Sequence, residues 1–103
     1  MIDMIKKFRK KPVVIEAIQW DGTEQSALEI VRWMNGNSPR FERVAKGLAK
    51  TCAKIGKINI ETKEGDINAI PYNWIIKGIV GEFYPCKPDI FAQTYEQVED
   101  DES

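Results

Sequence analysis

The chain has 103 residues, with 15 basic and 16 acidic side chains and a formal net charge of −1, which fits one small domain. Its composition, 43% hydrophobic and 30% charged, is typical of a soluble globular protein, and its balanced charge does not indicate a nucleic-acid or membrane partner. The chain has no histidine, which excludes serine–histidine and cysteine–histidine catalytic pairs and any zinc site with a histidine ligand. The two cysteines are too few for a four-cysteine zinc site, and we expect buried thiols.

The first eleven residues form a basic leader that ends at Pro12. A secretory signal would continue with an apolar run of roughly 7–15 residues, but the run that begins at Val13 stops at Glu16. No apolar run approaches the roughly 20 residues that cross a bilayer. We therefore expect a cytoplasmic protein without a membrane partner.

Residues 13–20 are rich in β-branched side chains and predict a strand, which Asp21-Gly22 ends. Thr23 is a suitable N-cap for the helix that follows. One apolar stripe with helical spacing supports that helix, and Asn35-Gly36 ends it. The stripe consists of Ala27, Ile30, Val31 and Met34.

Residues 37–56 form a basic insert that admits two interpretations. If the segment is helical, Val44, Leu48 and Ile55 form an apolar stripe, and four cations share another face. These are Arg43, Lys46, Lys50 and Lys54. Gly47 weakens such a helix by about 1 kcal/mol relative to alanine, so a loop or a broken helix is the alternative.

From Lys57 onward, apolar residues alternate with polar ones. This alternation predicts strands on either side of a hairpin turn at Glu64-Gly65. Further strands are predicted over residues 74–77 and 80–84. Pro85 and Pro88 are expected to bracket a turn, and Asp89 to cap a closing helix. Residues 99–103 form an acidic tail that we expect to be disordered.

This order of elements predicts an α+β fold in a single domain, residues 1–103. We expect a small antiparallel sheet of about five strands, one helix after the first strand and a short C-terminal helix. Because a domain of this size has a thin core, we also expect a homo-oligomer.

Lys77, Tyr84 and Lys87 are the candidate ligand-binding residues. Ammonium groups can hold phosphate and an aromatic ring can stack on a base, so the three could line a pocket for a nucleotide. The alternative is a solvated sheet edge with amphipathic lysines. The sequence predicts neither a cofactor nor a metal ion.

Trp33 lies off the apolar stripe of its helix, which makes it the candidate for a partner surface, whereas Trp20 and Trp74 are expected in the core. Arg40 and Arg43 would belong to the same surface. The basic run could contact phosphates, but few aromatic residues interrupt it, and we do not expect a nucleic-acid partner.

Both ends of the chain resemble a widespread family of small, uncharacterised bacteriophage and prophage proteins. The resemblance rests on residues 10–22 (KKPVVIEAIQWDG) and on residues 74–78, 81–91 and 94–96 (WIIKG, GEFYPCKPDIF and TYE). The family commonly has Pro-Gly-Asp-Trp where this chain has Pro71-Tyr72-Asn73-Trp74. Since tyrosine resists the positive φ that glycine allows, we expect a differently built turn.

The resemblance implies a phage origin and expression in the bacterial cytoplasm, and it supplies no catalytic motif. Small phage proteins of this kind are often counter-defence factors, an analogy of context. Our first hypothesis is a non-catalytic protein that sequesters a small anionic ligand, such as a cyclic nucleotide or an ADP-ribose-type immune signal. The alternative is a protein-interaction module that inhibits a host defence or metabolic protein.

Overall fold

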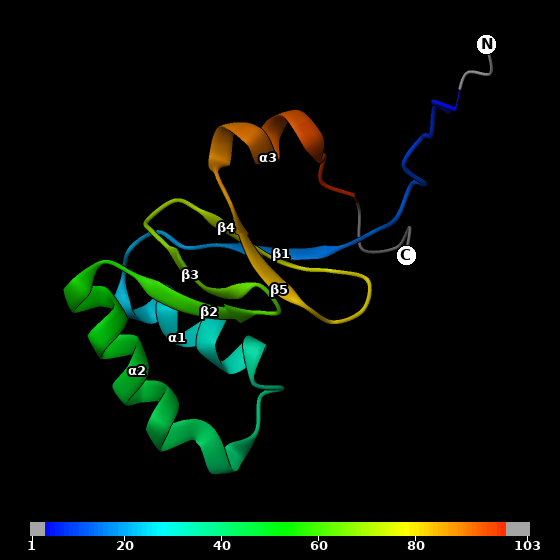
Figure 1. The fold of residues 1–103 in the computed structure, drawn as a ribbon. Coiled ribbons are helices and arrows are strands. Elements are labelled where there is room, and N and C mark those ends of the chain that lie inside the picture. The colour runs from blue at the N-terminus through cyan, green and yellow to red at the C-terminus, as the bar shows by residue number, and fades with distance from the viewer. Residues whose placement is uncertain (1–3, 99–103) are drawn as a thin grey trace.

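The computed structural model describes residues 4–98, so the predicted acidic tail, residues 99–103, lies outside the described residues. The fold is α+β, as predicted, with one helix after the first strand and a short helix after the last. The elements in chain order are β1 (Glu16–Gln19), α1 (Glu24–Met34), a 3-10 turn η1 (Pro39–Phe41), α2 (Glu42–Ile55), β2 (Ile58–Thr62), β3 (Gly65–Ala69), β4 (Trp74–Lys77), β5 (Phe83–Cys86) and α3 (Pro88–Thr94) (Figure 1).

The strands form two antiparallel sheets rather than the single sheet that the sequence predicts. β1, β4 and β5 form a three-stranded sheet with β4 in the centre, and β2 and β3 form a separate hairpin. The predicted hairpin turn at Glu64-Gly65 is confirmed, since Thr62 pairs with Gly65 across it. β5 begins at Phe83 rather than at Val80 and includes Pro85, which is tolerated because β5 is an edge strand.

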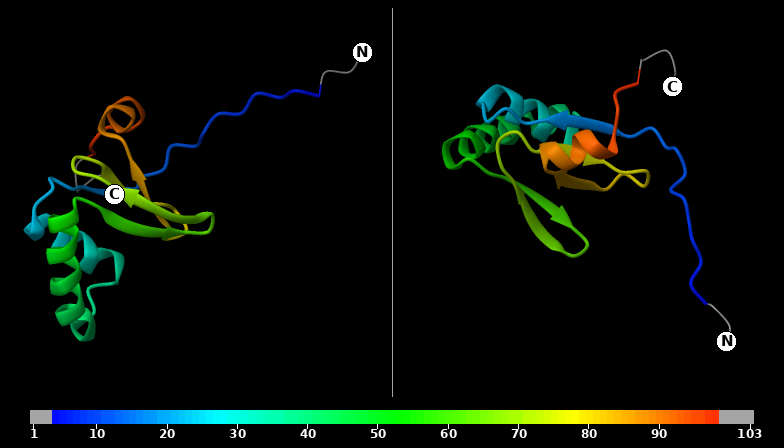
Figure 2. Two further views of the ribbon diagram at one scale, coloured as in Figure 1. Left: turned by 60° about the vertical axis from the view of Figure 1, so that its left-hand side comes forward. Right: turned by 90° about the horizontal axis from the view of Figure 1, so that it is seen from above.

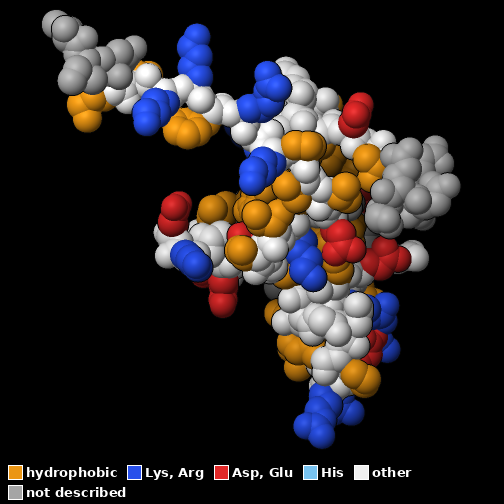
Figure 3. Space-filling model, turned by 90° about the vertical axis from the view of Figure 1, so that its right-hand side faces the viewer, with side chains coloured by type: hydrophobic (Ala, Val, Ile, Leu, Met, Phe, Trp, Pro, Cys, Tyr) orange, Lys and Arg blue, Asp and Glu red, His pale blue; other side chains and the backbone are white. Residues whose placement is uncertain are grey.

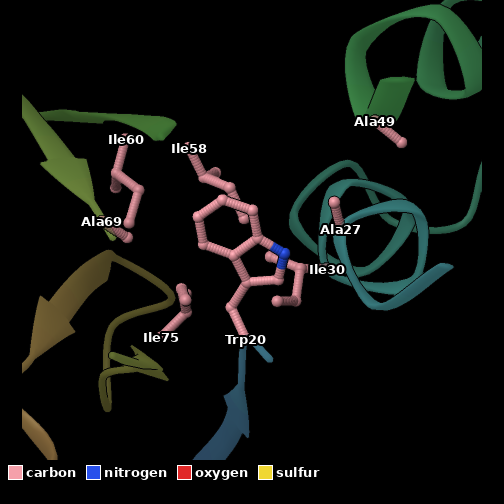
Figure 4. Packing of buried hydrophobic residues seen from close by; sticks show 8 residues of the cluster. All are labelled: Trp20, Ala27, Ile30, Ala49, Ile58, Ile60, Ala69 and Ile75. Carbon is pink, nitrogen blue, oxygen red and sulfur yellow. The ribbon is translucent and has the colours of Figure 1, made fainter. Parts of the chain in front are cut away.

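The main core lies between one face of the three-stranded sheet, helices α1 and α2, and the hairpin. The buried cluster consists of Trp20, Ala27, Ile30, Ala49, Ile58, Ile60, Ala69 and Ile75 (Figure 4). Trp20 is fully buried, as predicted, and its ring nitrogen donates a hydrogen bond to the Thr23 carbonyl at 3.0 Å. The indole thus gains a polar partner inside an apolar core, as buried tryptophans usually do.

The other face of the three-stranded sheet carries α3 and a small aromatic cluster. Trp74 stacks on Phe91, with ring centroids 4.2 Å apart, and Phe91 contacts Tyr95 at 4.9 Å. Trp74 is half-buried by this stack. Asp89 lies in the first turn of α3 rather than capping it, because the chain already turns at Lys87 and Pro88 occupies the first helical position.

Helix α1 follows its sequence pattern closely. Thr23 is the N-cap, and its hydroxyl accepts a hydrogen bond from the Ser26 amide at 3.2 Å. Ala27, Ile30 and Val31 of the predicted stripe are buried, and Met34 packs partly against the core. The strand before it is shorter than predicted, since only residues 16–19 of the segment 13–20 are paired.

Helix α2 resolves the ambiguity of residues 37–56 in favour of the helix, and the apolar stripe that the helix was predicted to carry is not the side that it buries. The buried residues are Ala45 and Ala49, whereas Val44, Leu48 and Ile55 are 52%, 44% and 60% exposed. Ala49 lies close to Ala27 of α1 within the core (Figure 4). Small side chains allow the two helices to approach closely, and this close approach leaves the larger apolar side chains outside the contact.

The turn before β4 has the backbone that glycine would permit, contrary to our expectation. Tyr72 has a φ of +74°, and the amide of Asn73 donates to the carbonyl of Ile70 at 3.0 Å. The Tyr72 carbonyl also accepts a hydrogen bond from the Gln19 side chain at 3.1 Å. These contacts tie the turn to the end of β1 and hold a non-glycine residue in the left-handed region, which is unfavourable for it.

The chain before β1 extends away from the body of the protein. Figure 1 and both views in Figure 2 show it leaving the sheet on the side opposite to α1 and α2. We call residues 4–11 the N-terminal arm. One of its cations is held near the body, because the Lys10 Nζ atom lies 5.7 Å from the centroid of the Tyr95 ring.

Candidate binding surface

The three predicted ligand-binding residues do not meet in one pocket. Lys77 pairs with Phe83, whereas Tyr84 pairs with Ile76. Since directly paired residues share a face and consecutive residues alternate, Lys77 and Tyr84 lie on opposite faces of the sheet. Lys87 is exposed at the start of α3. The expected pocket therefore is not formed by these three side chains.

Two of these residues, Lys77 and Tyr84, interact with neighbouring aromatic side chains instead. The Lys77 Nζ atom lies 6.0 Å from the centroid of the Phe83 ring, on the core face. Tyr84 faces α3, where burial, and secondarily a hydrogen bond with Tyr95, raises the pKa of its phenol to about 12. The phenol is thus neutral at physiological pH, which suits a packing role in the aromatic cluster.

The predicted partner-surface residues differ in how deeply they are buried. Trp33 is half-buried and packs against the core, with its ring edge-on to Phe83 at a centroid distance of 5.1 Å. Arg40 in η1 and Arg43 in α2 are exposed, as expected. Trp33 thus contributes to the packing of α1 on the sheet, and of the three residues only the two arginines are exposed.

A groove that sequence reasoning missed lies between the ends of α1, α2 and the hairpin. It has a volume of about 480 Å³, and its apolar walls include Val31, Met34, Phe41, Leu48, Ile60 and Phe83. The side chains come from five different elements, namely α1, η1, α2, β2 and β5. Only the tertiary fold brings them together.

The polar groups of the groove are few, and most already have partners. The Asn35 side chain donates to the Val31 carbonyl at 2.7 Å, and Asn59 donates to Asp66 at 3.4 Å. Cys52 also lines the groove, and burial raises the pKa of its thiol, which favours the protonated form at neutral pH. Glu61 is the remaining polar side chain of the wall; within residues 4–98 it forms no ion pair.

The groove continues into the exposed stripe of α2 through Leu48, which belongs to both. We call Val44, Leu48 and Ile55 the α2 stripe. The periodicity of residues 44–55 was the available sequence signal for this surface, since it predicted the stripe but not whether the stripe would be buried or exposed. An exposed apolar stripe beside an apolar groove is a feature typical of binding surfaces.

No group of three or more histidine, cysteine, aspartate or glutamate side chains within residues 4–98 could hold a metal ion. The described helices include none that is long and apolar enough to cross a membrane. Both cysteines are free thiols. The pKa of Cys86 is raised, first by burial and then by the charge of Asp89, so this thiol too is protonated.

A scan against protein-family models found no match, and searches of curated proteins and of solved structures found no significant one. The resemblance to phage proteins is therefore still a prediction from the sequence.

Proposed function

We propose that this protein is a non-catalytic protein-interaction module that binds an apolar segment of another protein in the groove and along the α2 stripe. The observation that carries the proposal is the exposure of Val44, Leu48 and Ile55 next to a groove with mainly apolar walls. Burying such side chains against a partner removes apolar surface from water, which is the main driving force of protein association.

The charge of the groove favours a protein segment over a small anion. The one charged side chain in its wall is Glu61, which repels phosphate groups. Nucleotide pockets instead surround phosphates with ammonium, guanidinium or backbone N–H groups. Of the cations that we assigned to such a pocket, Lys87 lies at the start of α3. Lys77 does not line the groove, although its Nζ atom lies 6.0 Å from the centroid of the Phe83 ring in the groove wall. Sequestration of a small anionic signal is therefore the less favoured hypothesis.

The wider context of the proposal comes from the resemblance of the chain ends to phage proteins. In that context the module acts in the bacterial cytoplasm, and the partner is a host defence or metabolic protein. The apolar groove suits inhibition by occupancy, in which the module covers a surface that the host protein needs for its own contacts.

A matched pair of variants tests the proposal. The full-length protein is immobilised and exposed to bacterial lysate, and the captured proteins are identified by mass spectrometry. Leu48→Asp places a charge in the groove and should abolish capture of any partner that uses it. Val80→Asp is the control, because Val80 is 75% exposed on the loop between β4 and β5, outside the groove.

Capture that survives in Leu48→Asp would contradict the proposal. Native mass spectrometry with a panel of cyclic nucleotides and ADP-ribose derivatives tests the alternative on the same preparations. A discrete added mass that Leu48→Asp leaves unchanged would establish a small-ligand function at another site.

A further inference from the structure

The N-terminal arm exposes large apolar side chains together with a high positive charge. Met4, Ile5 and Phe8 are 87%, 84% and 90% exposed. Residues 4–11 also contain five basic side chains and no acid, namely Lys6, Lys7, Arg9, Lys10 and Lys11. None of these five forms an ion pair with another described residue. Such a segment gains most from a surface that is apolar and negatively charged.

The groove has this complementary character. Its walls are mainly apolar, and Glu61, its charged side chain, forms no ion pair within residues 4–98. The same hairpin carries two exposed acids, Glu64 and Asp66, and one exposed cation, Lys63. An apolar side chain of the arm can therefore enter the groove while neighbouring lysines approach these carboxylates.

The arm of one copy does not lie near its own groove. All ribbon views show it extending away from the side of the body where α1 and α2 lie (Figures 1 and 2). Figure 3 shows the arm as a projection with lysine and arginine side chains along it, clear of the body over most of its length. The arm is thus positioned to reach a neighbouring molecule.

We infer that the groove binds the N-terminal arm of a second copy of this chain, with Phe8 as the apolar anchor. The inference rests on the proposed function, since it assigns a further occupant, the arm of a second copy, to the same groove. In a two-fold dimer each arm occupies the other copy's groove, so one contact is formed twice. The exchange adds buried apolar surface to a domain that has a thin core of its own.

Native mass spectrometry and size-exclusion chromatography of the full-length protein test this inference. The wild type should be a dimer that weakens as salt increases, because the arm's cations contribute to the contact. Phe8→Asp and Leu48→Asp should each weaken dimerisation by at least about tenfold, whereas the control Val80→Asp should not. Glu61→Lys is a second groove variant; Glu61 is exposed, so its replacement should leave the fold intact while weakening the dimer.

Mixing two monomeric variants gives the sharpest result. Phe8→Asp retains an intact groove, and Leu48→Asp retains an intact arm, so a mixture can form one correct arm–groove contact. A heterodimer that appears only in the mixture supports arm exchange. If the two variants do not associate, although each is folded and the wild type is a dimer, arm exchange is overturned.

Other outcomes separate this inference from the proposed function. A wild-type monomer, or a dimer that tolerates Phe8→Asp, overturns the arm exchange. If capture from lysate still depends on Leu48 in either case, the groove binds a different protein and the proposed function stands. If capture does not depend on Leu48, both proposals fail.

Discussion

Helices α1 and α2 have similar amphipathic sequences but use them in opposite ways. α1 buries its large apolar residues, such as Ile30 and Val31, whereas α2 buries Ala45 and Ala49 and exposes its larger apolar stripe. The comparison shows that periodicity identifies the apolar face of a helix, but the distance to its neighbour decides which side chains fit the contact. The face that does not fit stays exposed.

The largest expected effect on stability comes from replacing one large apolar side chain by alanine on each helix. Ile30→Ala should lower the free energy of unfolding by about 2–5 kcal/mol, because Ile30 is fully buried and leaves a cavity. Leu48→Ala should cost less than about 1 kcal/mol, because Leu48 is 44% exposed. Urea unfolding measures both. Equal losses would show that α2 buries its stripe in solution.

A second prediction concerns the close contact between the helices. Ala49→Leu should destabilise the protein by about 1–3 kcal/mol, because Ala49 is fully buried and a larger side chain overpacks the contact with α1. The matched control is Thr51→Leu, an exposed position on the same helix, where little change in melting temperature is expected. Tolerance of leucine at position 49 would argue against a tight helix contact.

A third prediction concerns Tyr72 in the turn before β4. This residue has a positive φ that its side chain makes unfavourable. Tyr72→Gly should relieve about 1–2 kcal/mol of left-handed strain, offset by about 0.5–1 kcal/mol for the greater freedom of glycine in the unfolded chain. We expect a net stabilisation of up to about 1 kcal/mol in thermal unfolding. A loss of stability would mean that the Tyr72 side chain forms stabilising contacts that outweigh the strain.

The smallest expected effect on stability concerns the N-terminal ends of the two helices. The carboxylate of Asp21 accepts hydrogen bonds from the Ser26 and Thr23 side chains and the Thr23 amide, whereas no side chain caps α2. These bonds, those from Ser26 first, lower the pKa of Asp21 from 3.8 to about 2. Because the pKa is lower in the folded state, the stabilisation is complete above pH of about 4 and is lost as the pH falls toward 2.

Asp21→Asn removes this titration. The difference in unfolding free energy between the wild type and Asp21→Asn should therefore shrink as the pH is lowered from about 5 to about 2. Chemical unfolding at a series of pH values measures it. A difference that stays constant with pH would show that the charge of Asp21 does not contribute.

Much of the fold could be predicted because several elements carry local signals. Thr23 at the start of α1 and Gly65 in the hairpin turn set the limits of elements whose spacing was already clear. The prediction of a ligand pocket was wrong because it depended on how strands pair, which is a contact between separate segments. The faces of Lys77 and Tyr84 depend on the pairing of β4 with β5, and the sequence does not specify where β5 begins.

The groove could not be predicted for a related reason. Its walls come from residues as distant in sequence as Val31 and Phe83, and no spacing rule connects them. Only Leu48 carried a signal, as a member of an apolar stripe. Periodicity alone does not show that small alanines form the helix contact instead and leave that stripe exposed.

The hydrogen bond between Gln19 and Tyr72 joins residues 53 positions apart, and this separation has a consequence for folding during synthesis. β1 is translated early, but its partner β4 appears only after α1, α2 and the hairpin have been made. Those intervening elements depend on nearer contacts and can form sooner, whereas pairing of β1 must wait for closure of a long loop. On the ribosome, the first strand therefore stays unpaired until β4 has emerged, and its apolar residues are available to chaperones throughout that interval.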